Sequence, residues 1–197
     1  MVSAILLAAG ESRRMGSLKQ LLPFSGKSFV RCCVDYLLAS KVSEVIVVTG
    51  HQESLIREEL AGRPVQLAHN ADYRRGMGSS VKRGFEAVST NSDAVLIALV
   101  DQPQIAPAII DKVIYAYETE RPLITIPAYH GRNGHPIILD MRLRDAIAGM
   151  DPELGLRQVV HAHAAGVASV AIESEAVVID FDYPEDYRRI RDGADFP

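Results

Sequence analysis

The residues between positions 8 and 19 have the types and spacing of a phosphate-binding loop. They follow a short apolar run at 4–7 and combine small side chains with three cations. Small residues let backbone N–H groups approach phosphate oxygens closely, and the cations balance the phosphate charge. The loop therefore predicts a nucleoside triphosphate site. Its small residues are Ala8, Ala9, Gly10, Ser12 and Gly16, and its cations are Arg13, Arg14 and Lys19.

This loop differs from the two commonest phosphate cradles. No Gly-Lys-Ser/Thr closes it, and it lacks the Gly-x-Gly-x-x-Gly pattern of dinucleotide sites. The alternative is a strand-to-helix turn whose glycines serve only the backbone and whose arginines are merely solvated. The clustered cations favour the phosphate site, and so does the loop's position, because ligands bind outside the carboxyl ends of the strands in open α/β sheets.

Two aspartates follow apolar runs and are candidate metal ligands. Asp101 comes after the run at 95–100, and Asp182 comes after the run at 177–179. Mg²⁺ prefers oxygen ligands, and it commonly takes one or two protein carboxylates and completes its shell with phosphate and water. We therefore predict a Mg²⁺ site formed by Asp101 and Asp182, with Asp180 a weaker candidate. The alternative is that each aspartate only begins a turn or caps the helix that follows.

The segment 70–84 is a second candidate for nucleotide contact. Gly76 and Gly78 free the backbone, and Ser79 and Ser80 stand where N-capping hydroxyls belong. Exposed N–H groups at such a helix start would face a base or a ribose. On the residues alone, a well-capped helix with no ligand explains the segment equally well.

Two later segments are candidates for contact with a second substrate. The glycine-broken loop 127–136 lies between two apolar strands and carries Arg132 and His135, which suit anionic groups of a bulky molecule. A histidine before a proline is also common as a plain turn residue. Arg157, after the turn at 151–155, is a further candidate for a substrate phosphate.

Strand-like and helical patterns alternate along the chain and predict how these loops are positioned. This alternation implies βαβ crossovers and therefore a mainly parallel sheet in a three-layer α/β/α sandwich of Rossmann type, formed by a single domain over 1–197. The apolar segments 167–172 and 177–179 are further strand candidates, one of them antiparallel, before a closing helix. We expect strands at 4–7, 45–49, 65–69, 94–100 and 123–126, and helices at 28–40, 53–61, 79–88, 107–118, 141–147, 154–164 and 184–191.

Composition excludes several classes of function. The chain has 197 residues, a net charge of −4, no Trp and 6% aromatic residues, which argues against nucleic-acid binding. No apolar run approaches the length of a membrane span, and no basic-then-apolar leader opens the sequence, so we expect a cytoplasmic protein. Cys32 and Cys33 are adjacent in an expected helix, where a disulfide would be strained, and we expect both to be reduced.

The first loop resembles the signature of a known family. The MobA-like nucleotidyltransferases, and within them the molybdenum-cofactor cytidylyltransferase branch, have a motif similar to Leu7-Ala8-Ala9-Gly10-x-Ser12-x-Arg14-Met15-Gly16-x-x-Lys19-x-Leu21-Leu22-Pro23. Further motifs of the branch follow in order over nearly the whole chain, at 70–81, 101–103, 131–136 and 180–186. Tyr183 replaces the usual Thr, and the segment 151–157 is longer than the branch's tight Asp-x-Gly-Ala/Leu-Arg.

The resemblance implies a function and a role for each motif. A phosphate of molybdenum-bound molybdopterin attacks the α-phosphate of CTP, and pyrophosphate leaves; Ala9 points to CTP because guanylyl-transferring relatives usually carry Gly there. The catalytic residues would be Lys19, Arg14 and Asp101, with Mg²⁺ held by Asp101 and Asp182. Nucleotide contacts would come from Leu7, Ala8, Ala9, Gly10, Ser12, Arg13, Arg14, Lys19, Gly78, Ser79, Ser80 and Asp101, and contacts to the pterin substrate from Arg132, His135 and Arg157.

Two other classes of function stay open. A nucleotidyltransferase for a sugar or alcohol phosphate, or one that transfers GMP from GTP, would keep the first loop and both aspartates. A chaperone without catalytic activity would bind the molybdenum cofactor and deliver it to a molybdenum hydroxylase as its client. The presence of Lys19, Asp101 and Asp182 argues against the chaperone, which needs no catalytic cations or carboxylates.

Overall fold

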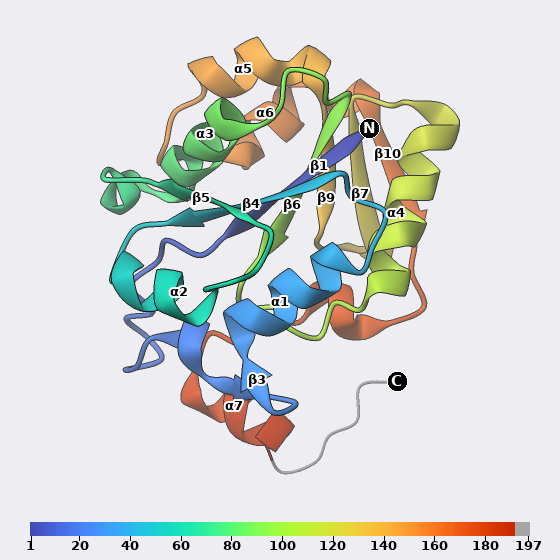
Figure 1. Cartoon of the computed structure of the whole chain (residues 1–197). Helices are drawn as coiled ribbons and strands as arrows, with labels where there is room; N and C mark the ends of the chain where they lie inside the picture. Colours follow the sequence, from blue (N-terminus) through green and yellow to red (C-terminus); the bar gives the residue numbers. More distant parts are fainter. Residues whose placement is uncertain (192–197) are drawn as a thin grey trace.

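A central sheet of eight strands forms the middle layer of the computed structural model, which describes residues 1–191. Its order is β10-β7-β9-β6-β1-β4-β5, with β8 paired to β7, and helices cover both faces (Figure 1). The predicted three-layer α/β/α architecture is therefore present. The strands of the sheet are β1 (Val2–Leu7), β4 (Glu44–Thr49), β5 (Gln66–His69), β6 (Ala94–Leu99), β7 (Ile124–Tyr129), β8 (Arg132–Asn133), β9 (Ile137–Asp140) and β10 (Val167–Ala171), and a separate ribbon pairs β2 (Pro23–Phe24) with β3 (Lys27–Ser28).

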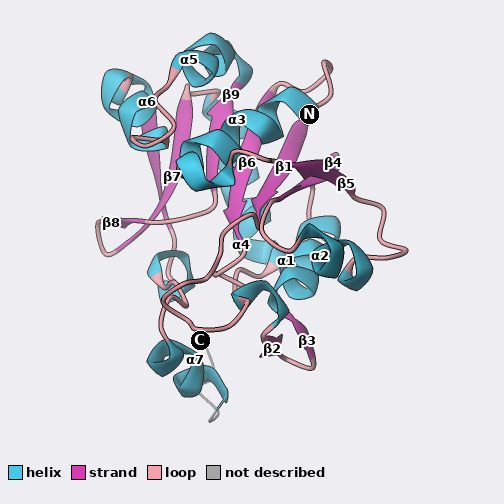
Figure 2. Cartoon of the chain, turned by 90° about the vertical axis from the view of Figure 1, so that its left-hand side faces the viewer, coloured by secondary structure: helices cyan, strands magenta, loops and turns pink. Residues whose placement is uncertain are grey.

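The two helical layers follow from the apolar faces of the strands. In β1, Leu6 packs into the core on the side of α1, α2 and α4, whereas Ile5 packs on the side of α3, α5 and α6 (Figure 2). Such two-sided burial is expected of a central parallel strand. The helices are α1 (Phe29–Leu38), α2 (Glu53–Glu59), α3 (Met77–Ala87), α4 (Pro107–Glu120), α5 (Arg144–Gly149), α6 (Leu156–Ala162) and α7 (Pro184–Arg191), with short 3-10 turns at η1 (Lys19–Leu21), η2 (Tyr73–Arg75), η3 (Met141–Leu143), η4 (Ala164–Gly166) and η5 (Glu175–Val178).

Two strands of the sheet run against the others, β9 and the short β8, which is antiparallel to β7. The strand β9 is antiparallel to both of its neighbours, β6 and β7, while the pairs β1–β4, β1–β6, β4–β5 and β7–β10 are parallel. The predicted antiparallel strand at 167–172 or 177–179 was wrong, because β10 is parallel to β7 and residues 175–178 form η5. The reversal occurs earlier, where the chain leaves β7, pairs back on it as the short β8 and continues into β9 without a crossover helix.

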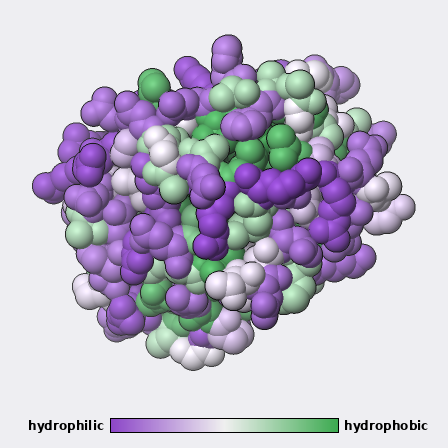
Figure 3. All heavy atoms as spheres, turned by 90° about the horizontal axis from the view of Figure 1, so that it is seen from above, coloured by the Kyte–Doolittle hydropathy of each residue, from purple (hydrophilic) through white to green (hydrophobic). Residues whose placement is uncertain are grey.

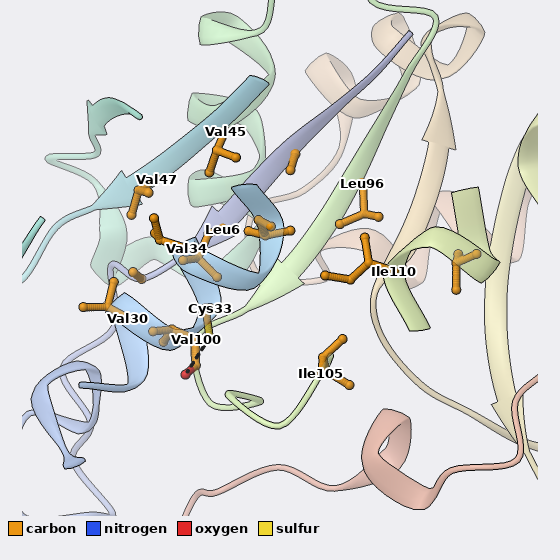
Figure 4. Packing of buried hydrophobic residues seen from close by; sticks show 14 of the residues in the cluster. Leu6, Val30, Cys33, Val34, Val45, Val47, Leu96, Val100, Ile105 and Ile110 are labelled. Atoms are coloured by element: carbon orange, nitrogen blue, oxygen red, sulfur yellow. Dashed lines mark hydrogen bonds between the residues drawn. The ribbon is translucent and has the colours of Figure 1, made fainter. Parts of the chain in front are cut away.

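The core beneath α1 closes the sheet face next to the first loop. Figure 4 shows Val34 of α1 packed near Leu6 of β1, with Leu96 of β6 close by, and all three are fully buried. Cys33 lies at the lower end of this cluster, where its Sγ donates a weak hydrogen bond to the Val100 carbonyl, and Cys32 and Cys33 are both free thiols. Truncating one such aliphatic side chain to Ala costs about 2–5 kcal/mol, so this packing fixes the strands relative to each other.

The two ends of the sheet differ in character. The amino ends of the parallel strands lie near α5, on the face seen in Figure 3, where hydrophilic residues surround a smaller hydrophobic area. The carboxyl ends lie at the opposite end, beside the first loop and α7 (Figure 2). Within residues 1–191, no helix has the length and apolar character needed to cross a bilayer.

Candidate active site

The loop that follows β1 is shaped by one buried amide, that of Gln20. Its Nε2 atom donates to the carbonyl oxygens of Ala8 and Gly10, both at 2.9 Å. Its Oε1 atom accepts from the Ser12 hydroxyl at 3.1 Å, and the Ser12 oxygen accepts from the backbone N–H of Lys19, also at 3.1 Å. Gln20 therefore folds the loop back on itself, so that Lys19 comes to the carboxyl end of β1.

Lys19 joins the two predicted metal-binding carboxylates. Its Nζ atom donates to Asp101 Oδ2 at 2.9 Å and to Asp182 Oδ1 at 2.6 Å, and Arg14 donates to Asp182 Oδ2 at 3.1 Å. Asp101 is there because β6 pairs in parallel with β1, so that their carboxyl ends share an edge. Asp182 arrives from the segment before α7. Residues far apart in sequence thus form one charged cluster.

The charges of this cluster shift one another's pKa values. The hydrogen bond from Lys19 lowers the pKa of Asp182. Burial favours the neutral form of Lys19, but the two carboxylates outweigh it and raise the pKa of the ammonium. For Asp180, burial together with the nearby charge of Asp101 raises the pKa of the carboxyl group. The cluster therefore holds Lys19 charged and Asp182 ionised at neutral pH.

The segment that carries Asp182 is fastened to the turn at Asp101. The backbone N–H of Phe181 donates to the Asp101 carbonyl at 3.0 Å, and Gln102 Nε2 donates to Asp180 Oδ1 at 2.8 Å. Each of these contacts ties the turn after β6 to residues 180–182. The distance between the two metal-binding candidates is consequently set by backbone contacts as well as by Lys19.

The loop between β7 and β9 supports the same segment. The backbone N–H of His135 donates to the Val177 carbonyl at 2.9 Å. Gly134 lies so close that a Cβ atom there would be 1.9 Å from the Val177 oxygen, so only glycine fits. Burial lowers the pKa of the His135 imidazole, and Asp101 is near enough to oppose that shift. His135 is thus held neutral next to the charged cluster.

A second ion cluster is centred on Glu11 of the first loop. Arg74 Nε donates to Glu11 Oε1 at 2.7 Å, the Tyr73 hydroxyl donates to the same oxygen at 3.3 Å, and Arg13 Nε donates to Glu11 Oε2. These two guanidinium groups lower the pKa of Glu11 to about 2. The cluster connects the first loop to η2.

The start of α3 differs from the prediction. The helix begins at Met77 with Gly76 as its N-cap residue and no side-chain cap, so Ser79 and Ser80 lie in its first turn and do not cap it. Both hydroxyls instead accept from Asn70 Nδ2, at 2.9 and 3.0 Å. The predicted capping role was wrong because the two glycines allow the helix to begin earlier than the serines suggest.

These clusters line a cavity of about 440 Å³ at the carboxyl edge of the sheet. Its volume suits a nucleotide-sized ligand. The predicted site residues that line it are Leu7, Ala9, Gly10, Ser12, Arg13, Arg14, Lys19, Ser80, Asp101 and Asp182. Gly76 and Met77, which belong to the segment 70–84 predicted to contact the nucleotide, also line it. The lining residues that were not singled out in the sequence are Glu11, Gln20, Tyr73, Arg74, Leu99 and Val100.

Three predicted nucleotide contacts lie outside this cavity. Ala8 is fully buried in the core. The Gly78 N–H donates to the Pro152 carbonyl at 3.1 Å, and a Cβ atom at Gly78 would be 2.7 Å from that oxygen. Ser79 donates to the Asp72 and Gly76 carbonyls and lines a separate cavity. None of the three is therefore placed to contact a ligand in this cavity.

The predicted substrate contacts are spread more widely. His135 is half-buried and near enough to Asp101 for their charges to interact, whereas Arg132 is exposed on β8 and Arg157 is exposed on α6. None of these three residues lines the cavity. The structure therefore brings together the phosphate loop and the two aspartates, with His135 beside them, but leaves Arg132 and Arg157 apart from this centre.

Comparison with known families identifies the chain. The profile of the MobA-like NTP transferase domain matches residues 4–167, which include the first loop, Asp101 and the loop that carries His135. The chain is a MobA-like NTP transferase. The matched region contains the carboxyl ends of β1 and β6, and the segment with Asp182 lies beyond it.

Curated relatives of this NTP transferase carry two different activities in their names. The nicotine blue oxidoreductase of Paenarthrobacter nicotinovorans is 32% identical over 155 residues, 75% of this chain and 74% of the relative. The molybdenum cofactor cytidylyltransferase of Escherichia coli strain K12 is 27% identical over 187 residues, 94% of this chain and 93% of the relative.

Solved structures agree with the fold of this NTP transferase over almost its full length. Rv0371c of Mycobacterium tuberculosis H37Rv has a TM-score of 0.87 at 26% identity, covering 98% of this chain and 97% of that one. A nucleotidyl transferase of Methanothermobacter thermautotrophicus has a TM-score of 0.84 at 28% identity, covering 98% and 96%. A complex of Rv0371c with manganese has a TM-score of 0.83 at 24% identity, covering 98% and 99%.

Proposed function

We propose that this MobA-like NTP transferase transfers CMP from CTP to the phosphate of molybdenum-bound molybdopterin and releases pyrophosphate. The observation that carries the proposal is the bridge from Lys19 to Asp101 and Asp182, beside the phosphate loop and inside one cavity. Carboxylates and cations in that arrangement suit transfer between phosphates, where charge builds on bridging oxygens.

The residues of the chain have distinct tasks in this reaction. The backbone of the first loop, held by Gln20, orients the triphosphate. Lys19 and Arg14 supply the positive charge that stabilises the developing charge as the acceptor phosphate attacks the α-phosphate and pyrophosphate departs. The acceptor oxygen is itself the nucleophile, so no covalent intermediate on a side chain is needed. The protein thus acts through position and charge.

A divalent cation fits the carboxylate pair. Asp101 Oδ1 is buried and has no hydrogen-bond partner among residues 1–191, although its other oxygen is bound to Lys19. A bare carboxylate oxygen is a hard ligand of the kind that Mg²⁺ prefers. Asp101 and Asp182 would hold the ion, and its chemistry there is to neutralise charge on the phosphates. Manganese in a complex of the mycobacterial neighbour supports a divalent ion at this fold.

Two observations support the choice of substrates. The E. coli relative that covers 94% of this chain is a molybdenum cofactor cytidylyltransferase, and Ala9, which favours CTP in this family, lines the cavity. His135 and the loop 130–136 lie at the same edge, on the side where the pterin substrate enters in the family. We propose that His135, Arg132 and Arg157 serve the acceptor.

Pyrophosphate release tests the proposal directly. The purified protein is incubated with Mg²⁺, molybdenum-bound molybdopterin and each of CTP, GTP, ATP and UTP. We expect release with CTP and the cytidine dinucleotide as product, and no turnover for Asp101→Ala with its circular dichroism unchanged. Preference for GTP would place the protein in the guanylyl branch. Pyrophosphate release only with a sugar or alcohol phosphate would show that the acceptor is not molybdopterin. Binding of the molybdenum cofactor without pyrophosphate release would favour the chaperone.

A second assay on the same protein distinguishes nucleotidyl transfer from the oxidoreductase activity in the name of the Paenarthrobacter relative. Nicotine blue is offered with NADH or NADPH, and bleaching of the dye is followed by absorbance. We expect no bleaching above the rate without protein, because the cavity is built from phosphate-binding cations and carboxylates. Bleaching that survives Asp101→Ala and Lys19→Met would show a redox activity independent of this cluster.

A further inference from the structure

The Glu11 cluster has no task in the proposed transfer, although it lines the same cavity. Arg13, Arg74 and the Tyr73 hydroxyl all donate to one carboxylate. The guanidinium groups are largely exposed, with 79% of the Arg13 side chain and 70% of the Arg74 side chain accessible, whereas Glu11 is only 16% exposed. The anion is thus set inside and the cations stand at the cavity mouth.

This set of donors is the one expected around a phosphate group. Guanidinium groups recognise carboxylates and phosphates with the same planar fork of N–H donors. The Arg74 side chain also lies over the Tyr73 ring at 5.5 Å, and the ring is packed where a Cβ atom on Gly50 would be 2.8 Å from it. The tightly packed Tyr73 ring therefore positions the Arg74 guanidinium beside the cavity.

The negative charge of Glu11 would affect the binding of a triphosphate in this cavity. Among the lining residues, Glu11 is the carboxylate that does not contact Lys19, and it stands in the first loop between Gly10 and Ser12. A triphosphate brought to this loop meets an anion whose charge is satisfied by Arg13 and Arg74. Repulsion between phosphate and Glu11 falls if those two cations turn to the phosphates instead.

We propose that Glu11 is a resident stand-in for phosphate, and that Arg74, together with Arg13, exchanges from Glu11 to the triphosphate when the nucleotide binds. Arg74 is then a nucleotide-binding residue supplied by η2, which lines the same cavity as Lys19. The inference rests on the proposed function, because it assumes that the cavity takes a nucleoside triphosphate.

The test is a double-mutant cycle on binding of CTP and of inorganic triphosphate, measured by calorimetry with Mg²⁺ present. Arg74→Ala should weaken both ligands about tenfold, since a charge-assisted hydrogen bond contributes about that much. Glu11→Gln should tighten both several-fold, because Arg74 is then free. Arg75→Ala is the matched control: Arg75 is the next residue but lines the separate cavity, and its substitution should leave affinity unchanged.

The combined Glu11→Gln and Arg74→Ala variant decides whether Arg74 contacts the phosphates or only stabilises the first loop through Glu11. If Arg74 binds phosphate, Arg74→Ala still weakens binding about tenfold in the Glu11→Gln background. If the pair only braces the loop, Glu11→Gln weakens binding as much as Arg74→Ala does, and the combined variant is no worse than either one; that result overturns the inference. Wild-type protein that binds neither ligand overturns the proposed function with it, whereas wild-type binding with unchanged Arg74→Ala overturns the exchange alone.

Discussion

Replacing Lys19 with Met tests the centre of the site, because one ammonium contacts both carboxylates. Met keeps the length of the side chain and its apolar stem but removes the charge and its hydrogen bonds to Asp101 and Asp182. We expect a large fall in kcat, a smaller fall in stability and tighter binding of a divalent cation. The three effects have separate physical causes.

The magnitudes follow from the contacts. Loss of one preorganised donor to developing charge costs about 3–4 kcal/mol, so kcat should fall about a hundredfold to a thousandfold. Exposed ion pairs contribute up to about 1 kcal/mol, and breaking a fully buried pair costs about 3–5 kcal/mol. Lys19 is 12% exposed, Asp101 20% and Asp182 36%, which places the loss of stability between these limits, at about 2 kcal/mol. That corresponds to a fall in Tm of about 4–8 °C.

The assays are pyrophosphate release for kcat, thermal unfolding for Tm and calorimetric titration with Mn²⁺ in the absence of nucleotide. Lys27→Met is the control, since Lys27 is 48% exposed and pairs at 2.7 Å with Asp35 outside the cavity. Mn²⁺ should bind the Lys19 variant more tightly, because its carboxylates no longer have an ammonium to neutralise them. A kcat within threefold of wild type, or unchanged Mn²⁺ affinity, would refute the reasoning.

Three further expectations concern the same edge of the sheet. Asp101→Asn should abolish Mn²⁺ binding in calorimetry while Tm stays within a few degrees of wild type; retained binding would remove Asp101 from the metal site. Gly134→Ala forces a Cβ to 1.9 Å from the Val177 carbonyl, so urea unfolding should show a loss of about 1–3 kcal/mol, and an unchanged midpoint would contradict this contact. Because the folded pKa of Asp182 is lowered, its stabilising contribution is present above the unfolded value near 4 and is lost as the pH falls through the folded pKa. Asp182→Asn should therefore be less stable than wild type at pH 7, with the difference vanishing as the pH falls below the folded pKa of Asp182.

The sequence predicted the parts of the site that depend on strand ends. The run before Gly10 and the run before Asp101 are buried parallel strands, and adjacent parallel strands bring their carboxyl ends to one edge whatever connects them. For that reason the phosphate loop and Asp101 could be placed together without coordinates. The reversed strand β9 was not predicted to be antiparallel, because an apolar run does not state its direction.

The missed residues act through contacts between distant segments. Gln20 is an ordinary amide in the sequence, and only its burial to 1% exposure under the first loop makes it the organiser of that loop. Arg74 and Glu11 are common surface types, and nothing in their local spacing indicates that η2 lines the same cavity as Gly10. One signal was available in the sequence. Both glycine-bearing segments are rich in charged residues, with the acid Glu11 in the first loop and Arg74 and Arg75 in the segment 70–84.

The antiparallel course of β9 has a consequence for which residues near the site can change. No crossover helix joins β7 to β9. The connection 130–136, which includes β8, forms a hairpin tip that is held by the His135 and Gly134 contacts to Val177. Gly134 and His135 are fixed by these contacts, whereas the exposed residues 130–133 can change without altering strand order. The parallel half of the sheet keeps the phosphate loop and Asp101 in register, so changes in the exposed part of the tip leave that edge of the sheet in place.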